Sequence, residues 1–460
     1  MTLIKSISGI RGTIGGKPGE ALTPVDIVKF SAAYGTWLKR RNANKKLKVV
    51  TGRDARKSGA MVSGLVNLTL SGLGIDITDV GLATTPTVEL AVTGTGSDGG
   101  VIVTASHNPA EWNALKLLNE KGEFLTAADG AEVLEIADNE DFVFAGVDEA
   151  GFVTSDGSWN KKHIEAILGL KLVNTDAIRS AGFRITVDCI NSVGSIIIPD
   201  LLNALGVKDV ILLNGVPDGN FAHNPEPLPA NLVDISELTR KERAHAGFVV
   251  DPDVDRLAII CEDGSMFGEE YTLVAVSDYV LSHTPGNTVS NMSSTRALKD
   301  ITEKYGCSYF SAAVGEVNVV TEMKKHDAVI GGEGNGGVIY PALHYGRDAL
   351  AGIALFLTLL AESRMSCSDM RSTYPGYVIA KKKLELSPDV DFSRILDMVR
   401  SQFRHHLIDE RDGMKIEMEN GWVQIRKSNT EPIMRVYAEG RNGKEADDLA
   451  DSVIKIVKNI

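Results

Sequence analysis

The sequence predicts an α/β protein of four domains, three similar ones and a smaller C-terminal α+β domain. Strand-like apolar runs alternate with helix-like segments in three successive stretches, and this alternation is typical of mostly parallel sheets covered by helices. The last stretch, roughly 85 residues long, instead has two neighbouring strands between two helices. At about 150 residues per domain, the length of 460 residues alone favours three domains, so the fourth rests on this change of pattern.

The first stretch covers residues 1–145. Thr23, Pro24 and Asp26 have the residue types of a helix N-cap, a first turn and a capping box, so we expect a helix from there to about Arg40. The other expected elements are a strand at Lys48–Gly52, a helix at Met61–Gly72 and a strand at Gly100–Thr104.

The pattern then restarts twice. In the second stretch we expect a strand at Phe183–Asp188, a helix at Ser195–Leu205, and strands at Val210–Leu213 and Gly247–Val250. In the third we expect strands at Leu257–Cys261, Thr288–Asn291 and Ala328–Ile330, and a helix at Leu350–Glu362.

The C-terminal stretch has a predicted helix at Phe392–Arg404, strands around Trp422–Ile425 and Met434–Ala438, and a final amphipathic helix. Loops at Asp138–Gly157 and near Ser372–Gly376 mark two of the boundaries. The predicted domains cover residues 1–150, 151–256, 257–371 and 372–460.

Composition excludes several classes of function. With 61 acidic and 48 basic residues the net charge is −13, which argues against nucleic acid and anionic membranes as partners but allows a small anion in a local basic cleft. The four cysteines form no metal-binding or disulfide pattern. No run of 18 apolar residues occurs, and Met1–Gly16 lacks the core of a signal peptide. We therefore expect a soluble, cytoplasmic protein.

Three aspartates alternate directly after an expected strand, at Asp251, Asp253 and Asp255. Alternate side chains of an extended loop point the same way, so the carboxylates converge and need a hard cation such as Mg²⁺. An EF-hand is excluded because Arg256 stands where that loop needs glycine and strands flank the loop. A solvated acidic turn is the alternative. Arg256 suits a phosphate oxygen.

A second loop, Thr104–Pro109, also follows a strand, where ligands of open α/β sheets bind. Its Ser106 is followed by His107 and Asn108 and shortly afterwards by Lys116. Such a serine is either a covalent nucleophile or part of an ordinary turn, and spacing alone leaves both open.

Two later loops favour a sugar phosphate. Gly331–Gly337 has five glycines in seven residues, which let the backbone come close to a ligand, and Glu333 and Asn335 are placed to bind vicinal hydroxyls; the alternative is a flexible turn. Arg426–Pro432, with Arg435, offers two arginines, hydroxyls and an amide, which form either a phosphate cradle or a solvated hairpin turn. Together the four loops indicate phosphoryl transfer on a sugar phosphate.

In this order and spacing the loops resemble the α-D-phosphohexomutase family over nearly the whole chain. The matching motifs are Ser8–Gly12 with Arg11, the phosphoserine loop Thr104–Pro109, Asn113–Lys116, Pro217–Phe221, Asn224–Pro227, the metal loop Asp251–Arg256 and the phosphate loop Ser428–Pro432. Ala114 replaces the glycine usual in the N-G-x-K motif.

The resemblance implies a heart-shaped enzyme in which one loop from each domain meets in a central cleft. Ser106 would carry a phosphate, and one Mg²⁺ per site would be held by Ser106, Asp251, Asp253 and Asp255. A hexose 1,6-bisphosphate would serve as intermediate and activator. Lys116, Arg11 and His107 would be the candidates for proton transfer or transition-state contact. The substrate would be held by Arg256, Glu333, Asn335, Arg426, Ser428, Asn429, Thr430 and Arg435.

The sugar is less closely specified. Many bacterial members have serine and histidine where this chain has Asn335 and Gly337, and the form found here resembles archaeal-type phosphoglucosamine mutases. Glucosamine 6-phosphate is therefore the expected substrate of a monomer or homodimer, with a phosphomannomutase/phosphoglucomutase as rival. A metal-dependent phosphomonoester hydrolase and a non-catalytic sugar-phosphate-binding protein are alternatives of other classes.

Overall fold

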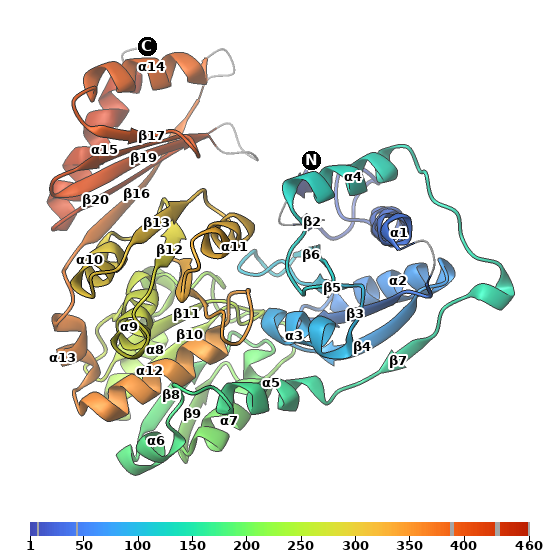
Figure 1. The fold of residues 1–460 in the computed structure, drawn as a ribbon, viewed down its shortest axis with the longest axis horizontal. Coiled ribbons are helices and arrows are strands. Elements are labelled where there is room, and N and C mark those ends of the chain that lie inside the picture. The colour runs from blue at the N-terminus through green and yellow to red at the C-terminus, as the bar shows by residue number, and fades with distance from the viewer. Residues whose placement is uncertain (7–8, 43–44, 387–390, 428–432, 459–460) are drawn as a thin grey trace. The chain divides into compact units, whose positions relative to one another are not determined.

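A computed structural model describes residues 1–6, 9–42, 45–386, 391–427 and 433–458. The chain divides into two compact units, the first formed by residues 1–272 and 335–368 and the second by residues 273–334 and 369–460. Each unit is built around sheets of the expected kind, and the prediction of four α/β-type domains with mixed sheets is confirmed (Figure 1).

The first unit begins with a seven-stranded sheet of order β1-β2-β6-β5-β3-β4-β7. Its strands are β1 (Ile4–Ser6), β2 (Gly9–Thr13), β3 (Lys48–Arg53), β4 (Asp76–Leu82), β5 (Gly99–Val103), β6 (Trp112–Leu118) and β7 (Val153–Ser155). The helices are α1 (Pro24–Arg41), α2 (Gly59–Gly72), α3 (Thr85–Thr95) and α4 (Ala127–Asp138). The strands β5, β3, β4 and β7 run parallel, whereas β1, β2 and β6 pair antiparallel.

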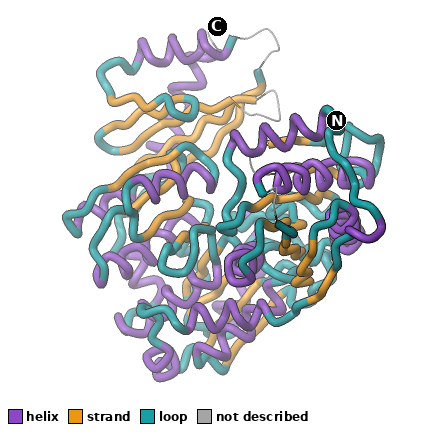
Figure 2. Tube along the Cα trace, turned by 45° about the vertical axis from the view of Figure 1, so that its right-hand side comes forward, coloured by secondary structure: helices purple, strands orange, loops and turns teal. Residues whose placement is uncertain are grey.

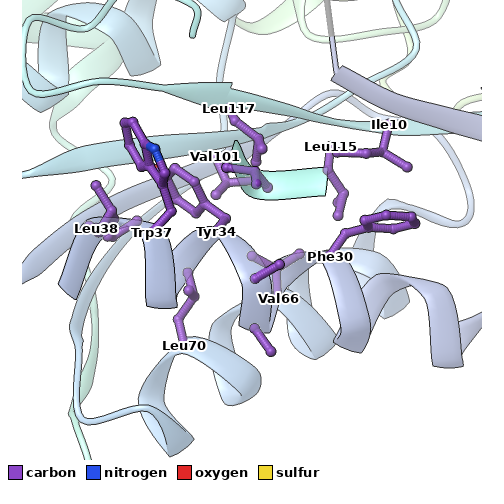
Figure 3. Packing of buried hydrophobic residues seen from close by; sticks show 14 of the residues in the cluster. Ile10, Phe30, Tyr34, Trp37, Leu38, Val66, Leu70, Val101, Leu115 and Leu117 are labelled. Carbon is purple, nitrogen blue, oxygen red and sulfur yellow. The ribbon is translucent and has the colours of Figure 1, made fainter. Parts of the chain in front are cut away.

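The core of this first domain lies between the sheet and one layer of helices. Phe30 and Trp37 of α1 and Val66 and Leu70 of α2 pack against β5 and β6 (Figure 3). Thr23 forms the predicted capping box with Asp26 at the start of α1. On the opposite face of the sheet α3 packs against β3 and β5. This arrangement leaves the carboxyl ends of β3 and β5 at one edge of the sheet.

The second sheet also belongs to the first unit and has the order β11-β10-β8-β9. It contains β8 (Arg184–Asp188), β9 (Asp209–Leu213), β10 (Ala246–Val250) and β11 (Leu257–Cys261), with helices α5 (Trp159–Leu168), α6 (Thr175–Ala181), α7 (Gly194–Leu205) and α8 (Val233–Lys241). We expected Leu257–Cys261 to open the third domain. In the structure the turn before it is a hairpin, and β11 folds back antiparallel onto β10. The predicted domain boundaries stay predictions.

The first unit is completed by β15 (Gly337–Ile339) and α12 (Ala349–Ser363). In the second unit β12 (Thr288–Asn291), β13 (Tyr309–Ala312) and β14 (Ile330–Glu333) run parallel, with α10 (Ala297–Lys304) and α11 (Glu316–Lys325). Helices α9 (Glu269–His283) and α13 (Cys367–Ser372) connect the two units along the chain.

The C-terminal domain has a five-stranded antiparallel sheet of order β16-β20-β19-β18-β17. Its strands are β16 (Val378–Glu385), β17 (Leu407–Asp409), β18 (Met414–Met418), β19 (Gly421–Lys427) and β20 (Ile433–Gly440). Helices α14 (Phe392–Gln402) and α15 (Gly443–Lys458) share one core with this sheet (Figure 2). Of the helices described, none combines the length and the apolar character needed to cross a bilayer.

Candidate functional site

Ser106 lies at the carboxyl end of β5 in a strained loop. Its φ of 48° is left-handed, a region that residues other than glycine seldom occupy. The backbone N–H of Ser106 donates to Thr104 Oγ1 over 3.0 Å, and Thr104 in turn donates to Asp54 over 2.6 Å. The loop conformation is therefore fixed by side chains at the ends of two neighbouring strands, β3 and β5.

Arg56 is the main support of this serine loop (residues 104–109). Its guanidinium donates to Asp54 and to the backbone carbonyls of Ser106, Asn108, Pro109 and Trp112, at distances of 2.5–3.1 Å. The guanidinium also lies 4.9 Å from the ring centroid of Phe221. Only 1% of Arg56 is exposed, so these bonds form away from water, where an unmade hydrogen bond is costly.

The predicted metal ligands form one buried cluster at the hairpin between β10 and β11. Each of Asp251, Asp253 and Asp255 has no exposed surface, and one carboxylate oxygen from each lies within 4.8 Å of the other two. Val254, with a φ of 61°, turns the chain between them. The expectation that the three side chains converge is confirmed.

The serine hydroxyl joins this acidic turn (residues 251–256). Ser106 Oγ donates to Asp251 Oδ2 over 2.6 Å and lies 3.3 Å from His107 Nδ1. The other oxygen of Asp251 accepts from the backbone N–H groups of Asp255 and Arg256 over 3.2 Å. Ser106 and the triad therefore meet as the sequence predicted.

Cations hold one oxygen of each of the other two carboxylates. Lys116 Nζ lies 2.7 Å from Asp253 Oδ2, and an arginine that sequence reasoning missed, Arg347, donates to Asp255 Oδ2 over 2.7 Å. Thr85 also donates to Asp253 Oδ2, over 2.5 Å. The remaining oxygens, Asp253 Oδ1 and Asp255 Oδ1, are buried and have no hydrogen-bond partner among the described residues.

Neither oxygen accepts a hydrogen bond from the described residues, although Arg256 Nε lies 3.8 Å from Asp255 Oδ1, and both fit a bound cation. A buried carboxylate oxygen without a partner is costly, and all-oxygen sets of this kind suit Mg²⁺. Burial, together with the charges of Asp255 and Asp253, raises the pKa of Asp251 well above its usual range. Burial also acts to raise the pKa of Asp255. The charges of Arg347, Lys116 and Arg256 nevertheless hold that pKa below its usual range.

The predicted proton-transfer residues Arg11, His107 and Lys116 belong to the same domain as the serine. Arg11 of β2 is paired with Ala114 of β6, two residues before Lys116, so both basic side chains belong to one face of the sheet. Burial and the charge of Arg256 lower the pKa of His107 well below its usual range. Burial acts to lower the pKa of Lys116, but Asp253 and Asp255 raise it. At neutral pH these shifts favour an uncharged His107 and a charged Lys116.

Two histidines and two carboxylates form a buried network that includes Asp348, the residue after Arg347. His163 and His344 both contact Asp348 Oδ2, at 2.9 and 3.2 Å, and His344 also contacts Glu89 at 3.2 Å. Burial acts to lower the pKa of His344, but Asp348 and Glu89 raise it to about 10. The other oxygen of Asp348 caps α12. The network joins α3, α5 and the segment before α12 within the first unit.

The predicted sugar-binding residues fall in different units. Strand β14 begins at Ile330, where the predicted strand Ala328–Ile330 ends, and Glu333 is its last residue. Glu333 accepts from Asn291 Nδ2 over 2.7 Å and from Gly315 N–H over 3.1 Å. Asn335 belongs to the first unit and accepts from Gly337 N–H over 3.2 Å.

The glycines of this segment serve close packing of the chain. A Cβ at Gly331 would lie 2.6 Å from Met323 Sδ, and a Cβ at Gly336 would lie 2.4 Å from the carbonyl oxygen of Leu257. Approach of a ligand, the reason we gave for them from the sequence, is therefore not needed to explain these two positions.

The predicted phosphate-binding residues of the C-terminal domain are only partly described. Arg426 and Arg435 are directly opposite one another on β19 and β20. Like charges in such a pair repel, and Arg426 has Asp412 at 2.9 Å as a counter-charge. Arg435 Nε is buried and has no hydrogen-bond partner in the part of the chain that is described. Ser428, Asn429 and Thr430 lie outside the described residues.

The chain matches known domain families along most of its length. The chain matches the four domain models described as phosphoglucomutase/phosphomannomutase: α/β/α domain I over residues 3–144, domain II over 161–264, domain III over 268–377 and the C-terminal domain over 382–456. The chain belongs to this phosphohexomutase family.

Similar phosphohexomutases carry two kinds of name. A phosphoglucomutase/phosphomannomutase of Thermococcus kodakarensis is 35% identical, with 97% of this chain and 98% of the relative covered. A probable phosphoglucosamine mutase of Methanopyrus kandleri is 32% identical, with 98% and 97% covered. A phosphoglucosamine/phosphogalactosamine mutase of Sulfurisphaera tokodaii is 30% identical, with 98% of each chain covered.

Solved phosphohexomutase structures have the same fold. A family member from Burkholderia thailandensis superposes with a TM-score of 0.84 at 25% identity, covering 99% of this chain and 98% of its own. An N-acetylphosphoglucosamine mutase of Aspergillus fumigatus, solved with GlcNAc-6P and magnesium, has a TM-score of 0.57 at 16% identity and covers 100% and 96%.

Substitution of Arg56 tests whether its side chain holds the serine loop in place. Arg56→Ala removes the charge partner of Asp54 and a hydrogen-bond donor from four backbone carbonyls, so we expect destabilisation of about 3–5 kcal/mol and faster amide exchange in residues 104–114. Exchange is measured by mass spectrometry, with Arg179→Ala, which removes an exposed ion pair, as control. Unchanged exchange in the serine loop would contradict this role.

The His344 network predicts a pH-dependent stability. The pKa of His344 is raised above its unfolded value near 6.5, so its contribution is fully present below about pH 6.5 and lost as the pH rises through about 10. We therefore expect His344→Ala to lower the unfolding temperature most at pH 6.5 and least at pH 10. The exposed His405→Ala is the control. An equal loss at both values would show that the ion pairs contribute nothing.

Proposed function

We propose that this phosphohexomutase interconverts hexose 6-phosphates and hexose 1-phosphates through a phosphorylated Ser106. The observation that carries the proposal is the 2.6 Å hydrogen bond between Ser106 Oγ and Asp251 in the buried triad. In the first transfer the bond between Ser106 Oγ and phosphorus breaks, and a hydroxyl of the sugar phosphate loses its proton as it bonds to that phosphorus. The resulting hexose 1,6-bisphosphate then returns its other phosphoryl group to Ser106.

Residues around the serine supply the charge that this chemistry needs. Phosphoryl transfer depends on positioning and on countering negative charge at the transferring group. Asp251, Asp253 and Asp255, with the phosphate on Ser106, would hold one Mg²⁺, which supplies Lewis-acid stabilisation of that charge when bound. Lys116, His107 and Arg11 are the candidates for proton transfer or transition-state contact, and Arg256 would face phosphate oxygens.

Residues of the later domains would bind the rest of the substrate. We assign the sugar hydroxyls to Glu333 and Asn335 and the non-reacting phosphate to Arg426, Ser428, Asn429, Thr430 and Arg435. The opposed arginines of β19 and β20 support the second assignment, because an anion relieves the repulsion between them.

We propose glucosamine 6-phosphate as the preferred substrate. The form of the sugar segment, with Asn335 and Gly337, supports this choice, as do the names of two relatives. The 35% identical Thermococcus relative favours the rival, a phosphomannomutase/phosphoglucomutase. We also propose that the enzyme works in the cytoplasm as a monomer or homodimer, on small sugar phosphates and without nucleic acid or membrane partners.

Intact-mass measurement tests the covalent step. Incubation with a hexose 1,6-bisphosphate should give a species about 80 Da heavier, and Ser106→Ala should abolish it along with turnover. The matched control is Ser97→Ala, a buried serine of the same domain. Absence of the heavier species during turnover would refute the phosphoserine mechanism. Release of free phosphate without isomerisation would identify a hydrolase, and binding without either reaction would identify a binding protein.

A substrate panel tests the choice of sugar. The purified enzyme with Mg²⁺ and catalytic bisphosphate is offered glucosamine, glucose and mannose 6-phosphates, and kcat/KM is compared. We expect the amino sugar to be turned over at least about tenfold more efficiently, a difference of about 1.4 kcal/mol in transition-state binding. Faster turnover of glucose or mannose phosphate would establish the rival specificity.

A further inference from the structure

Arg347 is a buried cation that lies outside every motif recognised in the sequence. It comes directly before α12 and is 8% exposed, and its guanidinium donates to Asp255 Oδ2 over 2.7 Å. Arginine remains protonated at every pH that a folded protein meets, so Arg347 places a permanent positive charge beside the acidic turn.

The side chain of Arg347 occupies room that Gly337 leaves open. A Cβ at position 337 would lie 2.3 Å from Arg347 Cδ and 3.0 Å from Arg347 Cγ. The backbones of the two segments run side by side, since Ile339 and Arg347 form an antiparallel bridge and Asp348 N–H donates to the carbonyl of Val338 over 2.8 Å. Any side chain at position 337 would therefore clash with the Arg347 side chain in its observed conformation.

The neighbours of Arg347 hold it in place. His344 is tied to Glu89 and Asp348 to His163, in each case through buried groups. At Gly346, between these two anchors, a Cβ would lie 1.9 Å from Glu89 Oε2, so only glycine permits this approach. Arg347 thus projects from a segment fixed on both sides to other parts of the first unit.

We propose that Arg347 is a positioning residue for the metal triad, and that Gly337 is small so that Arg347 can reach Asp255. Arg347 donates a hydrogen bond to Asp255 Oδ2, so Asp255 Oδ1 is the oxygen available to a cation. In the same way Lys116 and Thr85 bind Asp253 Oδ2 and leave Asp253 Oδ1 available. Partners that orient a metal-binding group in this way contribute to metal affinity although they do not touch the ion. The inference rests on the proposed function in so far as it takes the triad as the metal site.

Titration with Mn²⁺, followed calorimetrically, tests this role without any sugar turnover. Arg347→Ala should raise the Kd for Mn²⁺ about 10- to 100-fold, with Arg347→Lys in between because lysine lacks the planar fork. Arg179→Ala is the control and should bind as the unaltered protein does. Equal or tighter binding by Arg347→Ala would overturn the proposal, because it would mean that charge repulsion outweighs orientation.

Gly337→Ala completes a double-mutant cycle. The added methyl displaces Arg347, so the single variant should lose Mn²⁺ affinity nearly as much as Arg347→Ala, and the double variant should be no weaker than Arg347→Ala alone. Fully additive losses would overturn the proposed link between the two positions. If Arg347→Ala does not fold, as judged by circular dichroism, Gly337→Ala and Arg347→Lys carry the test.

The outcome separates this inference from the proposed function. Mutase turnover together with unaltered Mn²⁺ binding by Arg347→Ala and Gly337→Ala would refute the role of Arg347 alone. Loss of Mn²⁺ affinity in both variants of a protein that turns over no hexose phosphate would support Arg347 and refute the mutase.

Discussion

The burial of three aspartates in one hairpin turn is the constraint on which the first unit depends. Carboxylates this close repel strongly when water is excluded, so the turn is tolerable only if positive charge is brought to it. That charge comes from three places: Lys116 on β6, Arg256 in the turn itself and Arg347 before α12. The turn thereby draws together segments that are far apart in the sequence.

A second buried arginine solves a related problem at the serine. The left-handed backbone at Ser106 is unfavourable and persists only when its surroundings fix it. Arg56 provides this by donating hydrogen bonds to four backbone carbonyls, three of them in the serine loop, and Asp54 balances its charge. In both places buried charge is matched by buried charge, so the groups that we propose to react are held before any substrate arrives.

The sequence allowed us to predict the side chains that phosphoryl transfer would use, but not the buried arginines that fix their positions. Ser106 and the three aspartates were recognisable because they follow strand ends in known motifs, and Lys116 because it belongs to the motif Asn113–Lys116. Arg56 and Arg347 act on carbonyls and carboxylates that are distant in the chain, and a single arginine carries no such pattern. Asp54-Ala-Arg56 after a strand and Arg347-Asp348 before a helix were the only signals available.

Two further features depend on residues outside the local sequence pattern. Alternation of apolar residues revealed β11 as a strand but could not show that it turns back onto β10, because pairing depends on residues outside the pattern. Glycines in residues 331–337 were attributed to ligand approach, whereas Gly331 and Gly336 accommodate Met323 and Leu257. Helices with clear caps, such as α1, were predicted nearly to the residue because their signals are local.

Anomalous diffraction from crystals of the phosphorylated protein soaked in Mn²⁺ is the most direct test of the central claim, that the buried triad and Ser106 form one phosphoryl-transfer site. The account predicts a single strong peak at about 2.0–2.3 Å from oxygens of Asp251, Asp253 and Asp255 and from the phosphate on Ser106. A peak elsewhere, or an empty triad beside a phosphorylated serine, would contradict it.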